Sequence, residues 1–211
     1  MIVDVSEIFY SIQGEGTKIG QKAIFIRLCG CNLTCPFCDT KYALNCKNPM
    51  DDEKIYATIK DFPTKNIIFT GGEPVLRDDF MAYFMEKHSD YSYFLETNGT
   101  LFPQKSIKLF SHIVVSPKVF AINKDALKRI IETAASVEFK FVVDENPERE
   151  ITLLEELGLD EATFQPIWLD ETTESYINKT RKIIEYVKKL PYNIRIIPQL
   201  HKIVYGQRRG I

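Results

Sequence analysis

The cysteines of this chain are concentrated in one short segment, and this segment constrains the protein more than any other feature. Four of the five cysteines lie among the twelve residues from Cys29 to Thr40. Three of them, Cys31, Cys35 and Cys38, have the spacing Cys-x3-Cys-x2-Cys, which lets one loop hold three thiolates around a soft metal centre. A structural zinc site and an ordinary iron–sulfur cluster each take four protein ligands. Three thiolates therefore predict a cluster with one iron left open for a small molecule to chelate.

The other two cysteines have less specific interpretations. Cys29 is expected to act as a small apolar residue at the end of a strand, and Cys46 as a free thiol in a loop. A zinc site with either of them as the fourth ligand is the alternative for the whole segment. Phe37 places an apolar ring beside the last cysteine, where it could shield a cluster from water.

Composition and charge exclude several classes of partner. The chain has 211 residues, 45% of them hydrophobic and 27% charged, and a net charge of −2. These values are typical of a globular protein with one sizeable core, and they give no general attraction to nucleic acid or to a membrane. No apolar run is long enough to span a bilayer, and residues 1–4 do not begin a signal peptide. We therefore expect a cytoplasmic protein whose clustered cysteines bind metal and form no disulfides.

Short apolar segments alternate with amphipathic ones along the chain. Extended segments are expected at 8–16, 23–28, 66–70, 93–96, 113–115, 137–143, 164–168 and 194–197. Helices are expected at 51–62, 77–88, 123–135, 148–157 and 175–190, with a short one before residue 113 and Gly158 as a C-cap. This order predicts a parallel α/β sheet in a single domain, residues 1–211. Because the chain is short for an eight-fold barrel, we expect a partial, open TIM-like barrel with about six core parallel strands and few helices.

Unusual segments follow four of the predicted strands. They are the cysteine segment, 71–74, 96–98 and 116–118. Ligands of parallel α/β folds bind at the carboxyl ends of the strands. The four segments therefore predict one site on one rim of the sheet.

Gly71-Gly72-Glu73-Pro74 ends the strand predicted at 66–70. Glycines allow backbone carbonyls to approach a ligand closely, and carbonyls together with a carboxylate can accept the three hydrogen bonds of an ammonium group. In isolation the same four residues would be a turn that ends a strand.

The cysteine spacing, the aromatic Phe37 and the Gly-Gly-Glu-Pro segment together resemble the radical S-adenosylmethionine superfamily. The resemblance implies a [4Fe–4S] cluster held by Cys31, Cys35 and Cys38. It also implies that the open iron chelates the amino and carboxylate groups of S-adenosylmethionine, which an electron from the cluster then cleaves. Gly72 would bind the methionyl amino group.

A narrower resemblance covers nearly the whole chain. The motifs are Ser11-Ile12-Gln13-Gly14-Glu15-Gly16, Arg27, Cys38-Asp39-Thr40, Phe69 to Pro74, Glu96 to Thr100, Ser116-Pro117-Lys118 and Gln199-Leu200-His201-Lys202. In this order they resemble the 7-carboxy-7-deazaguanine synthase family of the queuosine pathway. The resemblance implies a truncated α/β barrel, Mg²⁺, and conversion of 6-carboxy-5,6,7,8-tetrahydropterin to 7-carboxy-7-deazaguanine with loss of ammonia. It further implies a homodimer and an electron donor such as flavodoxin or ferredoxin.

The narrower resemblance also implies roles for individual residues. A guanidinium suits a planar carboxylate, so Arg27 would pair with the substrate carboxylate. The residues expected to contact the substrate are Ile12, Gln13, Gly14, Arg27, Thr70 and, through its terminal carboxylate, Ile211. The residues expected at the S-adenosylmethionine site are Gly72, Glu73, Glu96, Asn98, Ser116, Pro117, Lys118 and Gln165.

Thr40 is the position that the resemblance assigns to Mg²⁺. A hydroxyl is a hard oxygen ligand, and the substrate carboxylate could complete the coordination shell. The alternative is that Asp39 and Thr40 cap a helix. His201 is expected to be a packed or surface histidine.

Two other functions share part of this pattern. An activase of a glycyl-radical enzyme would have the same cysteine loop and the same Gly-Gly-Glu-Pro segment, but it would give Arg27 and Thr40 no small carboxylate to bind. A zinc-stabilised binding module would need only the cysteines.

Overall fold

The computed structural model describes residues 1–169, 172–206 and 208–210. The strands are β1 (Ile2–Ile12), β2 (Lys22–Leu28), β3 (Pro49–Asp51), β4 (Asn66–Gly71), β5 (Ser92–Thr97), β6 (His112–Val115), β7 (Val137–Val143), β8 (Glu161–Pro166) and β9 (Asn193–Ile196). The helices are α1 (Asp52–Ile59), α2 (Asp78–Lys87), α3 (Lys124–Thr133), α4 (Glu148–Glu156), α5 (Thr173–Val187) and α6 (Leu200–Tyr205).

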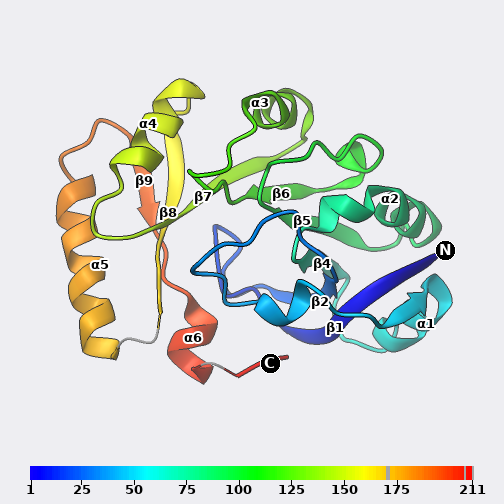
Figure 1. Cartoon of the computed structure of the whole chain (residues 1–211). Helices are drawn as coiled ribbons and strands as arrows, with labels where there is room; N and C mark the ends of the chain where they lie inside the picture. The colour runs from blue at the N-terminus through cyan, green and yellow to red at the C-terminus, as the bar shows by residue number, and fades with distance from the viewer. Residues whose placement is uncertain (170–171, 207, 211) are drawn as a thin grey trace.

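All nine strands form one sheet in the order β3-β1-β2-β4-β5-β6-β7-β8-β9. The pairs formed by β2 and β4 to β9 are all parallel. In contrast, β1 pairs antiparallel with β2 and with β3. Figure 1 shows helices α1 to α5 in an arc around the outside of this curved, open sheet. The predicted partial barrel is thus confirmed, and the antiparallel pair at its first edge is an addition that the sequence pattern did not predict.

The main core lies between the sheet and the surrounding helices. Side chains alternate along a strand, so Ile24, Ile26 and Leu28 of β2 enter this core while Ala23 and Phe25 face the concave side. Several helices begin where the sequence predicts. The side chain of Asp51, for example, accepts a hydrogen bond from the Lys54 amide at the start of α1. The segment at 77–88 begins later than expected, because Pro74 starts a 3₁₀ turn that continues into α2 at Asp78.

The concave face of the sheet is unusually polar. Parallel sheets are normally apolar on both faces. Here the concave face carries buried polar side chains from three adjacent strands, namely His112, Glu138, Lys140, Thr163 and Gln165. Charge on a buried face is costly unless it is paired, so the polarity of this face identifies it as the functional side of the sheet.

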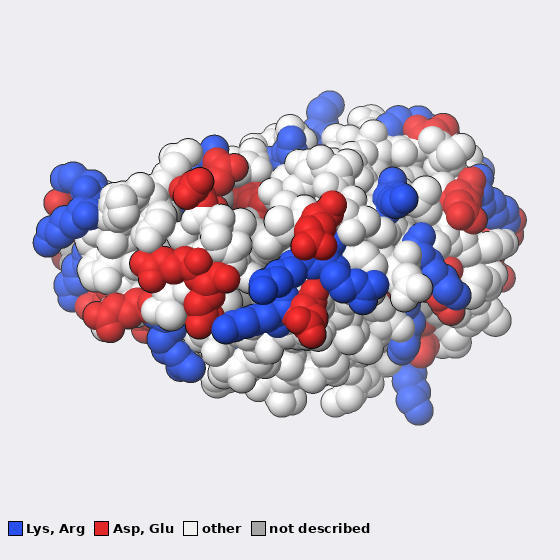
Figure 2. Space-filling view, turned by 90° about the horizontal axis from the view of Figure 1, so that it is seen from above, with Lys and Arg blue, Asp and Glu red and all other residues white. Residues whose placement is uncertain are grey.

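Figure 2 shows Lys and Arg side chains interspersed with Asp and Glu over the face seen from above. Within the described residues, no helix is both long and apolar enough to cross a membrane.

Candidate functional site

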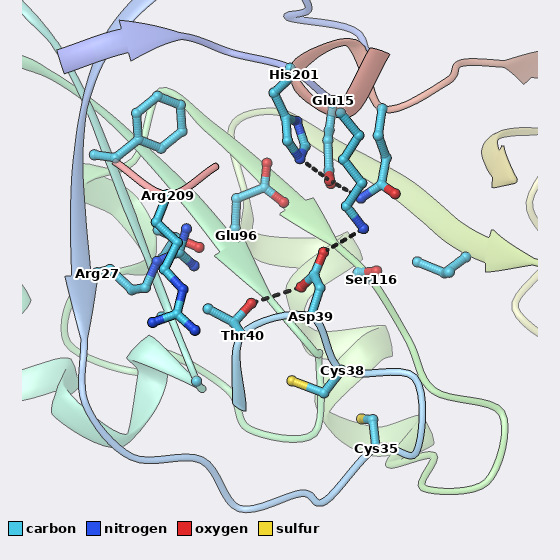
Figure 3. Close-up of a pocket in the computed structure, with 18 of the residues that line it drawn as sticks. Glu15, Arg27, Cys35, Cys38, Asp39, Thr40, Glu96, Ser116, His201 and Arg209 are labelled. Carbon is cyan, nitrogen blue, oxygen red and sulfur yellow. Dashed lines mark hydrogen bonds and ion pairs between the residues drawn. The ribbon is translucent and has the colours of Figure 1, made fainter. Parts of the chain in front are cut away.

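A cavity of about 540 Å³ opens at the carboxyl ends of the parallel strands. Segments that are far apart in the sequence line it: the loop after β1, the cysteine loop, the strand ends, α6 and the segment after α6. In Figure 3, Cys35 and Cys38 lie at one end of this cavity, and Glu15 and His201 lie at the other. The predicted convergence of strand-end motifs on one rim is therefore seen in the structure.

The double glycine at the end of β4 lets the backbone cross the start of the cysteine loop. The Gly72 amide donates to the Leu28 carbonyl at 3.2 Å, and the Glu73 amide donates to the Gly30 carbonyl at 2.8 Å. A Cβ on Gly71 would lie 2.3 Å from the Leu28 oxygen, and one on Gly72 would lie 2.2 Å from the Gly30 oxygen. Only glycine fits at both positions, so these residues hold the cysteine loop against β4.

The thiols of Cys31, Cys35 and Cys38 are free and partly exposed in the cavity wall. Burial raises the pKa of Cys31 and of Cys35, and a bound metal centre would favour their thiolates. Among the described residues, no three His, Cys, Asp or Glu side chains converge as ligands of a single ion. Three free thiols on one loop are the ligand set of a cubane that keeps one iron open.

The predictions for the remaining two cysteines were wrong. Cys29 and Cys46 form a disulfide with their Cα atoms 5.5 Å apart. The backbone brings them together, because the Gly30 amide donates to the Ala43 carbonyl at 2.8 Å. The disulfide closes the cysteine loop at its base and leaves three thiols. Three is the number needed by a cluster in which one iron has no cysteine ligand.

Glu73 is buried and its carboxylate is already engaged. It accepts hydrogen bonds from the amides of Val75 (3.0 Å) and Asn98 (2.7 Å) and from the hydroxyl of Thr97 (2.8 Å). Burial nevertheless raises its pKa. Glu73 thus joins the end of β4 to the end of β5. Asn98 in turn donates to the Asn32 side chain at 3.1 Å, which links the β5 end to the cysteine loop.

Arg27 lies on the concave face near the end of β2. Its Nε donates to Glu7 Oε1 at 2.7 Å, and the Tyr42 hydroxyl donates to the same oxygen at 2.6 Å. The guanidinium of Arg209 lies 3.9 Å from the centre of the Tyr42 ring. Figure 3 shows Arg209 and Arg27 close to Thr40. Two guanidiniums at this end of the cavity favour an anionic ligand group.

Thr40 does not cap a helix, so that alternative was wrong. It precedes a 3₁₀ turn, but its side chain makes no capping hydrogen bond. The hydroxyl donates instead to Asp39 Oδ1 at 2.8 Å, and Asp39 Oδ2 lies 3.0 Å from Lys202 Nζ. Burial opposes ionisation of Asp39, but the nearby Lys202 ammonium lowers its pKa overall. Asp39 is therefore a carboxylate, and Thr40 lies beside it in the lining of the cavity.

The far end of the cavity holds an ionic network that the sequence did not predict. The buried Lys140 donates to Glu15 Oε2 at 2.5 Å and to Glu96 Oε2 at 2.9 Å. Gln199 donates to Glu15 Oε1 at 2.7 Å, and His201 lies 4.0 Å from the same oxygen. The signal in the sequence was the pair of charged residues at alternate positions of an otherwise apolar strand, β7.

Other predicted residues occupy the walls of the same cavity. Those on its lining are Ile12, Gln13, Gly14, Thr70, Ser116, Lys118 and Gln165. Gln13 donates to Glu96 Oε1 at 2.9 Å. Lys118 donates to the Ser116 carbonyl and hydroxyl at 2.8 and 2.9 Å, and burial lowers its pKa.

Three of the predicted residues require separate mention. Gln165 is 2% exposed and its Oε1 has no hydrogen-bond partner within the described part of the chain, so this oxygen is available to a ligand. Pro117 lies outside the lining, in the segment between two residues that line the cavity. Ile211 lies outside the described residues.

Comparison with known proteins gives concordant results. The model of the radical SAM superfamily matches residues 25–180. The chain is 35% identical to the 7-carboxy-7-deazaguanine synthase of Aquifex aeolicus over 210 residues, which is 95% of this chain and 93% of that protein. It is 32% identical to the enzyme of the same name from Archaeoglobus fulgidus, covering 96% of this chain and 98% of that protein.

The fold has a solved counterpart in the crystal structure of QueE from Escherichia coli. The two structures align with a TM-score of 0.67 and 24% sequence identity, over 93% of this chain and 94% of the other. This structural likeness agrees with the partial barrel. The match to the superfamily agrees with the three free thiols that lie beside a double glycine. The chain therefore belongs to the radical SAM superfamily and, within it, to the family of the 7-carboxy-7-deazaguanine synthases.

Proposed function

We propose that this chain converts 6-carboxy-5,6,7,8-tetrahydropterin to 7-carboxy-7-deazaguanine with loss of ammonia. The observation that carries the proposal is the meeting of three free thiols, a double glycine, Arg27 and Thr40 around one cavity. A glycyl-radical activase would have no use for a cation beside this cavity. The relatives of this chain that are named as synthases support the same choice.

Membership of the radical SAM superfamily implies a [4Fe–4S] cluster and S-adenosylmethionine as cofactors. Cys31, Cys35 and Cys38 would hold the cluster. When bound, these cofactors supply the one-electron chemistry that removes a hydrogen atom from the substrate. Gly72 fits the adjacent position, because any side chain there would fill the space next to the Cys31 Cβ, 2.8 Å away.

The protein positions the cofactor through the strand ends beside the cluster loop. Ser116 and Lys118 present polar groups after β6, and the free oxygen of Gln165, on β8, would accept a hydrogen bond from the cofactor. Glu73 acts indirectly, because its carboxylate holds the β4 and β5 ends together. Asn98 extends the same arrangement to the cluster loop.

The substrate would lie between Arg27 and the ionic network of Glu15, Glu96 and Lys140. Arg27 is held by Glu7, which fixes the guanidinium for a carboxylate. At the other end, carboxylates and the Gln13 amide offer acceptors and a donor to the pyrimidine edge of a pterin. The walls of the cavity would hold the reacting carbon in place.

Mg²⁺ is a further part of the proposal. The Thr40 hydroxyl and the Asp39 carboxylate are hard oxygen donors of the kind that Mg²⁺ takes, together with water and substrate oxygens. Thr40 and Asp39 would hold Mg²⁺ at the end of the cysteine loop, where the ion would supply Lewis-acid chemistry to the substrate carboxylate.

Several other expectations stay proposals. One continuous sheet supports a single domain over residues 1–211. Exposed apolar side chains on α5 and α6, such as Ile184 and Val204, support a homodimer. An electron donor such as flavodoxin or ferredoxin, and a cytoplasmic location, rest on the sequence alone.

The test is anaerobic incubation of the reconstituted protein with carboxytetrahydropterin, S-adenosylmethionine, reductant and Mg²⁺. We expect 7-carboxy-7-deazaguanine and ammonia in equal amounts. Arg27→Gln should raise KM for the pterin roughly tenfold or more, the size of a lost charge-assisted hydrogen bond. A fully loaded protein that makes no deazapurine would disprove the proposal, and zinc without sulfide in the anaerobically purified protein would disprove the cofactor assignment.

A further inference from the structure

The loop between β1 and β2 spans the concave side of the barrel. We call residues Gln13 to Gln21 the strut loop. Its base is closed by hydrogen bonds from the Gln13 amide to the Gln21 carbonyl (2.7 Å) and from the Gly20 amide to the Gln13 carbonyl (2.8 Å). Three strands, β4, β5 and β6, lie between β2 and β7 in the sheet. The tip of the strut loop nevertheless contacts Glu138 of β7, so it crosses the open barrel from one side to the other.

The tip of the strut loop is bound by one buried carboxylate, that of Glu138 on β7. The Thr17 amide donates to its two oxygens at 3.1 and 2.9 Å, and the Thr17 hydroxyl donates at 2.6 Å. Thr163 of β8 donates from its hydroxyl at 2.5 Å, and His112 Nε2 of β6 lies 3.5 Å away. The carboxylate thus connects the strut loop to three adjacent strands.

The strut loop and β7 match in their spacing. Glu138 and Lys140 are two residues apart and point to the same face of β7. They bind Thr17 and Glu15, which are also two residues apart, in the opposite order along the chain. A shift of the loop by two residues that brought Glu15 against Glu138 would leave Lys140 facing Gln13. Like charges in a buried site make that register unfavourable. The pairs Glu138–Thr17 and Lys140–Glu15 therefore define one position of the loop.

We propose that Glu138 is a positioning residue for the substrate end of the cavity. It touches neither the cavity lining nor the proposed substrate, but it fixes the strut loop that carries Gln13, Gly14 and Glu15 into the cavity. Without this anchor the loop must become ordered each time the substrate binds. The free-energy cost of that ordering weakens substrate binding. The inference rests on the proposed function for the identity of the substrate, but not for the anchoring itself.

The test compares Glu138→Gln with Thr17→Val, Thr17→Ser and a matched control. The glutamine keeps the size of the side chain but replaces an acceptor oxygen with an amino group that cannot accept from Thr17 or Thr163. Thr17→Val removes one hydroxyl donor and keeps the shape, and Thr17→Ser restores that donor. Glu161→Gln is the control, because Glu161 is an exposed carboxylate on β8 that pairs only with Arg195 among the described residues.

Two measurements are made on each variant. In the protein without ligands, we expect amide hydrogen exchange of residues 14–20 to accelerate roughly tenfold or more in E138Q, the size of one hydrogen bond to a charged group, with exchange in β4 unchanged. In the reconstituted enzyme, KM for the pterin should rise by a similar factor while kcat stays nearly constant. T17V should show a smaller rise, and T17S and E161Q should behave like the wild type.

Three outcomes in E138Q would overturn the inference. The strut loop could exchange at the wild-type rate, or exchange could accelerate equally throughout the chain. Exchange of the loop could also accelerate while KM for the pterin stays unchanged. A wild-type protein that does not convert the pterin would count against the proposed function instead. The exchange rates would still decide whether Glu138 holds the loop.

Discussion

Gly72 lies where the end of β4 crosses the cysteine loop, and its lack of a side chain has two consequences. The Glu73 amide can reach the Gly30 carbonyl, and the Cys31 side chain has room beside the backbone. An alanine would place its Cβ 2.2 Å from the Gly30 oxygen, which neither backbone can accommodate without moving. The residue therefore couples the backbone of β4 to the position of the first cluster ligand.

Gly72→Ala should accordingly impair cluster binding more than it impairs folding. We expect a loss of about 1–3 kcal/mol in the free energy of unfolding, as for overpacking elsewhere, and a clear drop in iron and sulfide bound per chain. Gly158→Ala is the control. Gly158 has a φ of 66° and open space around it, so alanine there costs only backbone strain of about 1–2 kcal/mol. Equal iron content in the two variants would contradict the assignment.

Glu138 gives a prediction about pH. Burial alone would raise its pKa, but the hydrogen bonds from His112, Thr163 and Thr17 lower the pKa from 4.5 to about 2. A depressed pKa in the folded state means that the carboxylate stabilises the protein above pH 4.5. This contribution is lost as the pH falls through about 2. The difference corresponds to about 3 kcal/mol.

Denaturant unfolding of wild type and E138Q at several pH values checks this expectation. The stability difference between them should be largest near pH 6–7 and should shrink steadily below pH 4.5, the ordinary value for a glutamate. Comparison of the two proteins cancels the other carboxylates, which titrate in both. A difference that does not change with pH would show that Glu138 is not held as an ion.

At the scale of elements, the disulfide between Cys29 and Cys46 constrains the loop that must hold a cluster. Its sequence separation is 17 residues, and the three cluster cysteines lie inside the closed segment. Closing a loop of this size stabilises a protein by about 3 kcal/mol, mainly by restricting the unfolded chain. It also withdraws two thiols that could otherwise compete for the open iron.

Cys46→Ser should therefore lower the free energy of unfolding of the cluster-free protein by about 3 kcal/mol. A reductant should destabilise the wild type to a similar extent and leave the variant unchanged. Thiol counting on the unreduced, denatured protein supplies the direct check, with three reactive thiols expected from Cys31, Cys35 and Cys38. Five reactive thiols would contradict the pairing.

The elements that could be predicted from the sequence are those with a strong local pattern. The strands from β4 to β7 are apolar runs bounded by turn residues, and α3 and α5 have clear helical periodicity. By contrast, β3 consists of three residues and exists because it pairs with β1. Helix α6 has six residues, and its Leu200 amide donates to the Gly14 carbonyl at 2.9 Å. Such tertiary contacts leave no periodic signal in the sequence.

At the scale of the whole molecule, the site was predictable where topology alone brings residues together. The carboxyl ends of parallel strands share one rim, so motifs that follow strands had to converge. The strut loop follows no such rule, because Thr17 and Glu138 are 121 residues apart and meet only across the open barrel. The disulfide was missed for a similar reason: the spacing of two cysteines does not show that a backbone contact brings them together.

The cluster loop, the strand ends and the strut loop all contribute to one cavity, so ligand binding should stabilise the whole fold. A ligand that binds only the native state adds about 2.7 kcal/mol at 100 times its Kd. For a domain of this size, that corresponds to a rise in Tm of about 5–10 °C. We expect S-adenosylmethionine to give this rise in the reconstituted protein, because the open iron provides part of its binding site.

The triple variant Cys31→Ala, Cys35→Ala, Cys38→Ala separates this effect from nonspecific stabilisation. It retains the strand ends and the Cys29–Cys46 disulfide, so it should fold, but it has no ligands for the cluster. Its Tm should not change when S-adenosylmethionine is added, whereas the wild type without its cluster should show at most a small shift. An equal rise in the Tm of the triple variant would mean that the strand ends bind the cofactor without the cluster. Cofactor binding would then not depend on the cysteine loop.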